Sequence, residues 1–449
     1  MKYVSTRSAE RKVDAAQAIV AGLSHEGGLY VPEEFPAIGA DRIEKMANLA
    51  YAARAKEILG AYLTDYTEEE LQQCVDGAYA PERFGGNPAP LEKVGGRFVL
   101  ELWHGPTHAF KDMALQMLPR LMTRAMKKTG VDKEVFILVA TSGDTGKAAL
   151  EGFRDVEGTQ VGVFFPVDGV SPAQRLQMVT QEGKNVHVCA VEGNFDDAQT
   201  GVKRIFGDDA FAKELAEKGY VLSSANSINW GRLVPQVAYY FSAYADLLAR
   251  GEIKMGDEVN FCVPTGNFGN ILAAYYAKRM GLPVGRLVCA SNSNNVLFDF
   301  IEQGVYNANR PFHKTTSPSM DILVSSNLER LLYELCGRKD GQVTQWMQAL
   351  KNGGVYTVDD NTHRALTESF DAGWADDEKA AETIRTVRDA HGYTMDPHTA
   401  VAWTVAEEYA KRTGDNRPMV VVSTASPYKF SRSVLTAIAG EGAAEGLDE

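Results

Sequence analysis

Cysteine is scarce in this chain. The five cysteines, at positions 74, 189, 262, 289 and 336, lie far apart and form no CxxC pair. That pattern is typical of a reduced intracellular protein and unlike a disulfide framework. The first twelve residues, MKYVSTRSAERK, lack the apolar core of a signal peptide. We therefore expect a cytoplasmic protein.

Long apolar runs, an excess of positive charge and metal-binding spacings are also missing. No apolar run could span a bilayer, and the net charge of −13 argues against a nucleic-acid partner. HExxH and GxSxG are both absent, so the sequence predicts neither a zinc site nor a serine hydrolase. His398 is interpreted as a satisfied histidine at the start of a helix.

What is present indicates a multidomain α/β protein. A length of 449 residues predicts two or three domains at roughly 150 residues each. Residues 1–98 look like a separate lead segment, with helical patterns over 42–59 and 68–75 and a linker-like GGNPAP at 85–90. This segment is expected to be an N-terminal accessory domain.

From residue 99 onward, short apolar runs alternate with helical patterns. Strands are predicted over 135–140, 161–165, 185–191, 259–263, 286–290 and 419–422. Between them, Ser171-Pro172 has the composition of a helix start, and residues 141–146 are predicted to form a loop. Such alternation predicts parallel sheets that helices cover on both faces.

A lysine stands out in residues 104–112, HGPTHAFKD. Lys111 has apolar neighbours and begins an apolar pattern over 114–125, although Pro119 must either delay or kink that helix. Burial disfavours the charged form of a lysine, which suits an amine that forms imines. On local context alone, however, a lysine at a helix end with a solvated head group is the commoner case.

A glycine-containing loop, PTGNFGN at 264–270, joins a predicted strand to a predicted helix. Its backbone N–H groups would point toward an anion at a helix N-terminus, such as a phosphate. The three spaced glycines of a dinucleotide fingerprint are not there. A plain strand-to-helix turn explains the spacing equally well.

Two further polar segments could bind a small anion. TSGDTGK at 141–147 resembles the end of a Walker A loop, but Thr141 stands where a glycine is required, so we reject nucleotide triphosphate binding. Its hydroxyl and N–H groups could hold a carboxylate or a phosphate, or merely form a turn. In SSANSINWGR at 223–232, Arg232 is a candidate for bidentate binding of an oxyanion, and an interdomain loop is the alternative.

Together these segments resemble threonine synthase, in the branch found in yeast and many bacteria, and more broadly the fold-type-II pyridoxal phosphate enzymes. The resemblance covers nearly the whole chain. Matching segments include 3–7 (YVSTR), 27–32 (GGLYVP), 142–146 (SGDTG), 171–174 (SPAQ), 194–199 (NFDDAQ), 226–230 (NSINW), 317–322 (SPSMDI), 325–327 (SSN), 396–399 (DPHT) and 423–425 (STA).

The resemblance implies a fold-type-II architecture and a set of site residues. A large cofactor-binding domain would comprise 99–134 and 246–449, with a smaller α/β domain nested at 135–245. Lys111 would carry pyridoxal 5′-phosphate as a Schiff base, and Thr424 would bond the pyridine nitrogen. The phosphate would lie on Gly266, Asn267, Phe268, Gly269 and Asn270. Candidates for binding the substrate are Ser142, Asp144, Thr145, Asn226, Ser227 and Arg232.

The implied reaction is that of a lyase in threonine biosynthesis, which converts O-phospho-L-homoserine and water to L-threonine and phosphate. The expected partner is that small molecule alone, with no nucleic acid and no membrane, for a monomer or a homodimer. The rivals are a threonine or serine dehydratase, a phospholyase of similar sequence that makes no threonine, and a binding relative without activity. An intact Lys111, glycine loop and Thr424 argue against the last.

Three positions depart from the family pattern. His108 stands where an apolar or aromatic residue is usual, Ser426 replaces a histidine, and Asn295 replaces an acid. None lies at Lys111 or in the 264–270 loop. They therefore put the fit of the substrate in question and leave the cofactor prediction intact.

Overall fold

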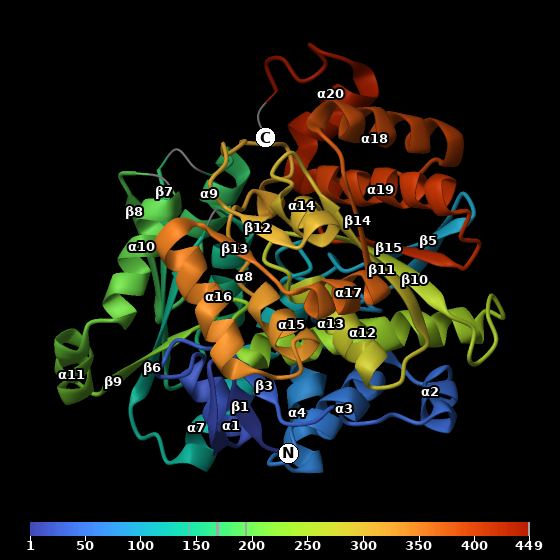
Figure 1. The fold of residues 1–449 in the computed structure, drawn as a ribbon. Coiled ribbons are helices and arrows are strands. Elements are labelled where there is room, and N and C mark those ends of the chain that lie inside the picture. Colours follow the sequence, from blue (N-terminus) through green and yellow to red (C-terminus); the bar gives the residue numbers. More distant parts are fainter. Residues whose placement is uncertain (142, 168–169, 194, 448–449) are drawn as a thin grey trace.

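Two sheets carry the core of the molecule (Figure 1). The computed structural model describes residues 1–141, 143–167, 170–193 and 195–447. The larger sheet has the strand order β14-β11-β10-β15-β5-β4, and its neighbours are parallel except for the β4–β5 pair. Its strands are β4 (Leu91–Val94), β5 (Arg97–Glu101), β10 (Val259–Pro264), β11 (Val284–Ser291), β14 (Phe370–Trp374) and β15 (Met419–Ser423).

Helices cover both faces of this larger sheet. Because side chains alternate along a strand, Phe261 and Val263 of β10 join one apolar cluster, whereas Cys262 between them joins another. Helix α13 (Gly269–Arg279) packs in the first cluster and α19 (Pro397–Thr413) in the second. The parallel sheet is thus buried on both faces, as the run of apolar residues in its strands predicts.

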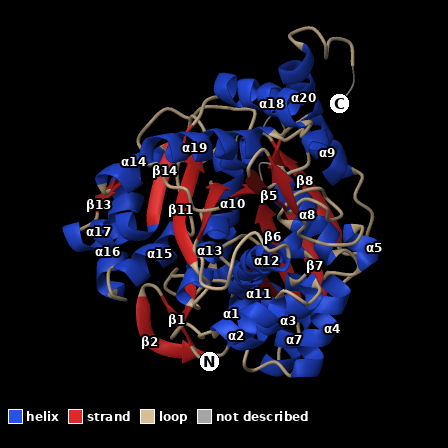
Figure 2. Cartoon of the chain, turned by 90° about the vertical axis from the view of Figure 1, so that its right-hand side faces the viewer, coloured by secondary structure: helices blue, strands red, loops and turns tan. Residues whose placement is uncertain are grey.

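The smaller sheet is parallel throughout and has the order β8-β7-β6-β9. Its strands are β6 (Glu134–Ala140), β7 (Thr159–Pro166), β8 (Val186–Val191) and β9 (Tyr220–Ser224). Helix α8 (Asp144–Phe153) packs on one face of it and α10 (Phe195–Phe206) on the other. Figure 2 shows the strands of both sheets enclosed by helices.

The N-terminal part of the chain lies beneath the two sheets in Figure 1. It contains a three-stranded antiparallel sheet of order β2-β1-β3 and five helices. These elements are β1 (Tyr3–Ser5), β2 (Ser8–Val13), β3 (Tyr30–Pro32), α1 (Ala15–Ala21), α2 (Ala40–Met46), α3 (Tyr51–Tyr62), α4 (Glu68–Ala78) and α5 (Pro81–Phe84).

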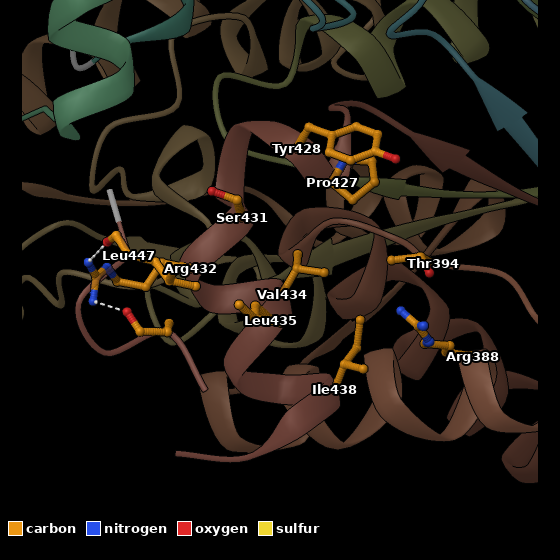
Figure 3. Close-up of a pocket in the computed structure, with 11 residues that line it drawn as sticks. Arg388, Thr394, Pro427, Tyr428, Ser431, Arg432, Val434, Leu435, Ile438 and Leu447 are labelled. Carbon is orange, nitrogen blue, oxygen red and sulfur yellow. Dashed lines mark hydrogen bonds between the residues drawn. The ribbon is translucent and has the colours of Figure 1, made fainter. Parts of the chain in front are cut away.

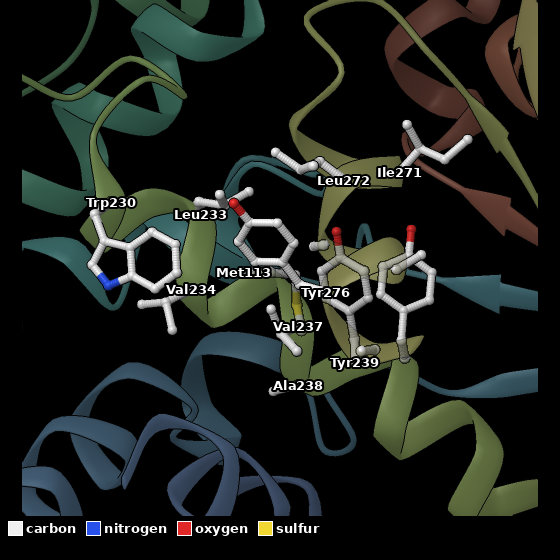
Figure 4. Close-up of a cluster of buried hydrophobic side chains, with 14 of the residues drawn as sticks. Met113, Trp230, Leu233, Val234, Val237, Ala238, Tyr239, Ile271, Leu272 and Tyr276 are labelled. Atoms are coloured by element: carbon white, nitrogen blue, oxygen red, sulfur yellow. The ribbon is translucent and has the colours of Figure 1, made fainter. Parts of the chain in front are cut away.

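The central helix α12 (Trp230–Ala249) joins the N-terminal part to the two sheets. Trp230 is fully buried at its start, and its ring lies 5.1 Å from that of Tyr3 and 5.4 Å from that of Tyr62. Figure 4 shows Trp230 with the apolar residues of α12 and α13. This cluster therefore links elements that are far apart in the sequence.

The remaining elements surround these layers. They are α6 (Asp112–Leu115), α7 (Leu118–Thr129), α9 (Pro172–Val179), α11 (Asp209–Glu217), α14 (Val296–Gln303), β12 (Val305–Asn307), η1 (Pro318–Met320), α15 (Leu328–Leu335), α16 (Asp340–Gly353), β13 (Val355–Thr357), α17 (Asp360–Ser369), α18 (Asp377–His391), η2 (Pro427–Phe430) and α20 (Ser431–Ala439). Of the helices that the structure describes, none combines the length and apolar character needed to cross a bilayer.

All six predicted strands are confirmed, with boundaries that differ by a few residues at most. The predicted helix start at Ser171 is also confirmed, since the Ser171 hydroxyl accepts a hydrogen bond from the backbone N–H of Gln174. The apolar pattern predicted over 114–125 is divided into a short helix directly after Lys111, α6, and the longer α7, where Pro119 takes the second position. Proline is compatible with that first turn, where no intrahelical donor is needed.

Two predicted boundaries are wrong. The pattern over residues 42–59 is divided into α2 and α3, because the buried guanidinium of Arg54 donates to the carbonyl of Met46 at 2.8 Å and satisfies the end of α2. The loop predicted over 141–146 is shorter, since α8 begins at Asp144. The division into domains stays a prediction; the boundary placed at residue 98 lies within β5.

Replacing Trp230 with alanine is expected to destabilise the fold by about 3–5 kcal/mol, because it leaves a large cavity among buried aromatic rings. The measurement is the denaturant dependence of circular dichroism. Tyr428 is 87% exposed, so Tyr428→Ala serves as the matched control and should change stability by less than about 0.5 kcal/mol. Equal stability of the two variants would contradict the packing described for α12.

Candidate active site

A cavity of about 230 Å³ lies where strands of both sheets end. It is bordered by the ends of β6, β9 and β10 and by the residue that follows β15. The carboxyl ends of parallel strands are the usual place for a ligand in such folds. Eleven of the predicted site residues line the cavity: Lys111, Thr145, Asn226, Ser227, Arg232, Gly266, Asn267, Phe268, Gly269, Asn270 and Thr424. Ser142 lies outside the described residues.

Lys111 presents its amine to this cavity from the turn before α6. Its side chain is buried, and Nζ donates a hydrogen bond to the hydroxyl of Ser319 at 3.0 Å. The nearest carboxylate is that of Asp144, with Oδ2 at 3.7 Å. Burial lowers the pKa of Lys111 to about 8, although the attraction of Asp144 acts in the opposite direction. The amine can therefore lose its proton near neutral pH.

Asp144 lies behind Lys111, at the start of α8, with no more than a few per cent of its surface exposed. Its Oδ1 is 2.6 Å from Nζ of Lys429 and accepts from Nε2 of Gln174 at 3.2 Å. Burial alone would raise the pKa of Asp144, but Lys429 and then Lys111 outweigh it and hold that pKa well below its usual range. The carboxylate is therefore ionised.

The loop from Gly266 to Asn270 follows β10 and enters α13. Ser325 donates to the carbonyl of Gly266 at 2.7 Å, and the backbone N–H of Asn327 donates to that of Asn267 at 3.0 Å. Phe268 adopts a left-handed conformation, with φ of 65°, where the helix begins. The first N–H groups of α13 have no partners within the helix, which makes this end an anion site.

Asn270 adds a donor to the same end of α13. The hydroxyls of Tyr239 and Tyr240 both donate to its Oδ1, the second at 2.7 Å. These two bonds fix the orientation of the Asn270 amide, and neither of them involves Nδ2. Nδ2 is buried and has no hydrogen-bond partner among the described residues. A buried donor without a partner costs free energy, so this atom points to a ligand.

Opposite, the segment after β9 contributes a buried cation. Arg232 donates from Nη1 to the carbonyl of Ala225 at 2.9 Å, but its Nε has no partner in the described part of the chain. Burial lowers the pKa of Arg232 to about 10, which keeps it charged at neutral pH. Oδ1 of neighbouring Asn226 is also unpaired there and can accept a hydrogen bond from a donor. The guanidinium of Arg232 could bind an oxyanion.

Thr424 and its neighbours border the remaining side of the cavity. Thr424 is buried, and its carbonyl accepts from the backbone N–H of Phe110 at 2.8 Å. Ala109 and Ala425 form an isolated antiparallel bridge beside it. The segment that carries Lys111 is therefore fastened directly to the one that carries Thr424.

Three residues of the site were not predicted from the sequence. Ser319 lies between Lys111 and Asp144, and its hydroxyl donates to Oδ2 of Asp144 at 3.3 Å. Lys429 pairs with Asp144, and His398 borders the cavity. Ser319 belongs to the SPSMDI segment, so the resemblance contained a signal for it. No local pattern distinguishes Lys429.

His398 is satisfied at the start of α19, as the sequence predicts. Its Nδ1 is 2.6 Å from Oδ2 of Asp396, and its Nε2 accepts from the backbone N–H of Ser319 at 3.1 Å. This pair of contacts corresponds to the neutral tautomer with the proton on Nδ1. His398 thereby supports the turn that carries Ser319.

None of the three departures from the family pattern is among the residues that line this cavity. His108 has φ of 56°, and its carbonyl accepts from the backbone N–H of Ser426 at 3.1 Å. Ser426 caps η2, and Asn295 accepts from Arg310 at 3.0 Å. His108 thus joins its turn to the one at Ser426, and the contact of Asn295 is with Arg310.

A second pocket, of about 360 Å³, lies between α18, η2, α20 and the residues that follow α20 (Figure 3). Its floor is apolar, with Val434, Leu435 and Ile438. Arg432 holds the chain there by donating to the carbonyls of Ala444 and Leu447. Neither Lys111 nor the Gly266 loop borders it, so the smaller cavity is the better candidate for catalysis.

Comparisons with known proteins agree with this choice. A family model described as "Pyridoxal-phosphate dependent enzyme" matches residues 86–425, and one described as "Threonine synthase N terminus" matches residues 2–79. The chain belongs to the pyridoxal-phosphate-dependent enzymes. Within that class, it belongs to the threonine synthase family.

Individual relatives cover nearly the whole chain. Threonine synthase of Pseudomonas aeruginosa is 40% identical over 99% of this chain and 92% of its own. The crystal structure of PLP-bound threonine synthase from Brucella melitensis is 42% identical, with a TM-score of 0.89 over 98% of this chain and 91% of that one. Human threonine synthase-like 1 is also 40% identical, but the chain spans only 60% of its length.

Pyridoxal 5′-phosphate is the cofactor that this family membership identifies. The residues of the cavity fit it. The start of α13 and the unpaired Nδ2 of Asn270 suit a phosphate group, and the amine of Lys111 lies in the same cavity. A cavity with both an anion site and a buried amine of lowered pKa is what such a cofactor requires.

Gly266→Ala is expected to weaken cofactor binding at least tenfold, because the added Cβ would lie 2.6 Å from the backbone carbonyl oxygen of Ser319. Either the 264–270 loop or the Ser319 turn must then move. Equilibrium titration with pyridoxal phosphate measures the effect. Gly39→Ala is the control, since nothing lies within 4 Å of its added Cβ. Unchanged affinity in Gly266→Ala would contradict the tight contact between loop and turn.

Proposed function

We propose that this chain converts O-phospho-L-homoserine and water to L-threonine and phosphate. The observation that carries the proposal is the combination of a buried amine with two separate anion sites in one cavity. The end of α13 with Asn270 is one site, and Arg232 is the centre of the other. A phosphate-bearing cofactor and a phosphate-bearing amino acid need two such sites.

Lys111 is the residue that we assign to covalent binding of the cofactor, as a Schiff base. Gly266, Asn267, Phe268, Gly269 and Asn270 would hold the cofactor phosphate, and Thr424 the pyridine nitrogen. When bound, the cofactor supplies an electron sink for the carbon atoms of the substrate. The burial of Lys111 and the orphaned Nδ2 of Asn270 support these roles.

Lys111 has a second role once the substrate amine has displaced it. Its free amine, with the pKa lowered to about 8, can take a proton from Cα or Cβ of the substrate and return it later. Ser319, which accepts from this amine at 3.0 Å, orients it toward the cavity. The same residue thus anchors the cofactor and moves protons.

The substrate anions are assigned to the opposite wall. Arg232 has an unpaired donor there, the side-chain amide N–H groups of Asn226 can donate, Ser227 and Thr145 add hydroxyls, and Asp144 balances the positive charge. Ser142, outside the described residues, stays a candidate from the sequence alone. Since Arg232 is buried, its attraction for a phosphate is stronger than it would be in water.

We also propose a cytoplasmic location, which the free thiols of Cys74, Cys189, Cys262, Cys289 and Cys336 support.

Lys111→Ala is expected to lower turnover by about 10²–10⁴-fold, which is the typical contribution of one acid–base group. It is also expected to abolish the visible absorbance of the lysine-bound cofactor. The assay measures phosphate release from O-phosphohomoserine together with threonine formation. Lys278→Ala, which removes a half-buried lysine at the end of α13, is the control and should retain activity. An active Lys111→Ala enzyme would overturn the assignment.

The products separate the proposed activity from its rivals. Phosphate without threonine would indicate a phospholyase, and a keto acid with ammonia from threonine would indicate a dehydratase. A wild-type protein that gives either result would contradict the proposed reaction, whereas the cofactor assignment would stand.

A further inference from the structure

Lys429 is a buried cation that the reaction described above does not use. It lies in η2, shortly after the segment of Thr424, and its side chain is 5% exposed. Nζ donates to the backbone carbonyl of Thr107 at 2.9 Å and lies 2.6 Å from Oδ1 of Asp144. Lys429 does not border the cavity, so it can act on a ligand only through its neighbours.

The two lysines bind Asp144 unequally. Lys429 is in direct contact with Oδ1, whereas Nζ of Lys111 is 3.7 Å from Oδ2 and makes its own hydrogen bond to Ser319. Lys429, which does not border the cavity, therefore neutralises the carboxylate of Asp144. The negative charge of Asp144 attracts the amine of Lys111 at this distance, but Lys429 already compensates that charge.

The other charged groups that act on Lys111 or Asp144, or adjoin them, come from several elements. Arg232 faces it from α12, and His398 faces Asp144 from α19. Asp112, next in sequence, accepts from the backbone N–H and the hydroxyl of Thr107, both at 2.7 Å. Of these groups, Lys429 is the one in contact with the carboxylate nearest to Lys111.

We propose that Lys429 is a positioning residue that compensates Asp144 permanently, so that Lys111 can lose its proton without leaving a buried carboxylate unpaired. An ion pair between Asp144 and Lys111 alone would hold the amine in its charged form, because separating the pair would leave a buried charge. With Lys429 present, Asp144 orients the amine through Ser319 and does not trap it.

The direction of the effect follows from charge. Lys429 repels a proton on Lys111, and it occupies the carboxylate that would attract one, so both contributions lower the pKa of Lys111. Removing the charge of Lys429 is expected to raise that pKa. The neutral amine, which attacks the cofactor and later accepts protons, would then form only at higher pH.

The test compares Lys429→Met, which removes the charge, with Lys429→Arg, which keeps it. Full-length protein is freed of cofactor, and the rate of covalent uptake of pyridoxal phosphate is followed by visible absorbance from pH 6 to 10. Lys278→Met is the matched control. It removes a half-buried lysine at the end of α13 that donates to the carbonyl of Gly285.

For the wild-type protein, the uptake rate is expected to rise with pH around a midpoint of about 8. In Lys429→Met the midpoint should move up by roughly one unit, which makes uptake about tenfold slower at pH 7. Lys429→Arg and Lys278→Met should titrate like the wild type. The acid limb of kcat in the holoenzyme should shift in parallel.

An unshifted midpoint in Lys429→Met would overturn the proposal, even if the variant were less stable, because a merely structural role lowers stability without moving a titration. Should that variant not fold, Lys429→Gln replaces it. Asp144→Asn is a second test, in which the midpoint of uptake should move in the opposite direction, to lower pH. An unchanged midpoint in Asp144→Asn would likewise refute the proposal.

The inference rests on Lys111 as the cofactor-binding residue and deepens the proposed function. Its failure is distinguishable from failure of that function. Uptake of pyridoxal phosphate does not require the substrate. The effect of Lys429 on the midpoint can therefore be measured even if the wild-type protein makes no threonine. If the wild-type protein forms threonine but the midpoint of Lys429→Met is unshifted, the role proposed for Lys429 is wrong and the proposed function stands.

Discussion

One buried carboxylate connects the parts of this site. Asp144 begins α8, which packs on the smaller sheet, whereas its two lysine partners come from segments that follow strands β5 and β15 of the larger one. A carboxylate buried as deeply as that of Asp144 is stable only when a cation compensates its charge. The two sheets therefore pack so that Lys429 contacts Asp144. The amine of Lys111 is then held beside a charge that already has a partner. The chemistry of the cavity depends on that arrangement.

The topology explains why residues so distant in sequence meet. Strand β15 lies between β10 and β5 in the larger sheet, so the segments that follow β5, β10 and β15 leave the sheet side by side. Lys111 comes from the first, the Gly266 loop from the second and Thr424 from the third. The bridge between Ala109 and Ala425 fixes two of them to each other. The positions of these groups therefore follow from strand order.

Much of this could be predicted from the sequence. Apolar runs predicted the strands, because that signal is local. Lys111 and the Gly266 loop were ambiguous from their neighbours alone, and the resemblance to threonine synthase assigned their roles. The division between α2 and α3 was missed because it depends on the guanidinium of Arg54, a tertiary contact. Lys429 was missed for the same reason: it has the sequence context of an ordinary exposed lysine, and its role arises only when η2 packs against Thr107 and Asp144.

The central claim is that Lys111 is the amine that bonds the cofactor. Its most direct test is reduction of the wild-type holoenzyme with borohydride, followed by digestion and mass spectrometry of the peptides. A pyridoxyl group on the peptide that contains Lys111, and on no other lysine, is the predicted result. Stoichiometric label on a different lysine, or no covalent label on a protein that binds the cofactor, would contradict it.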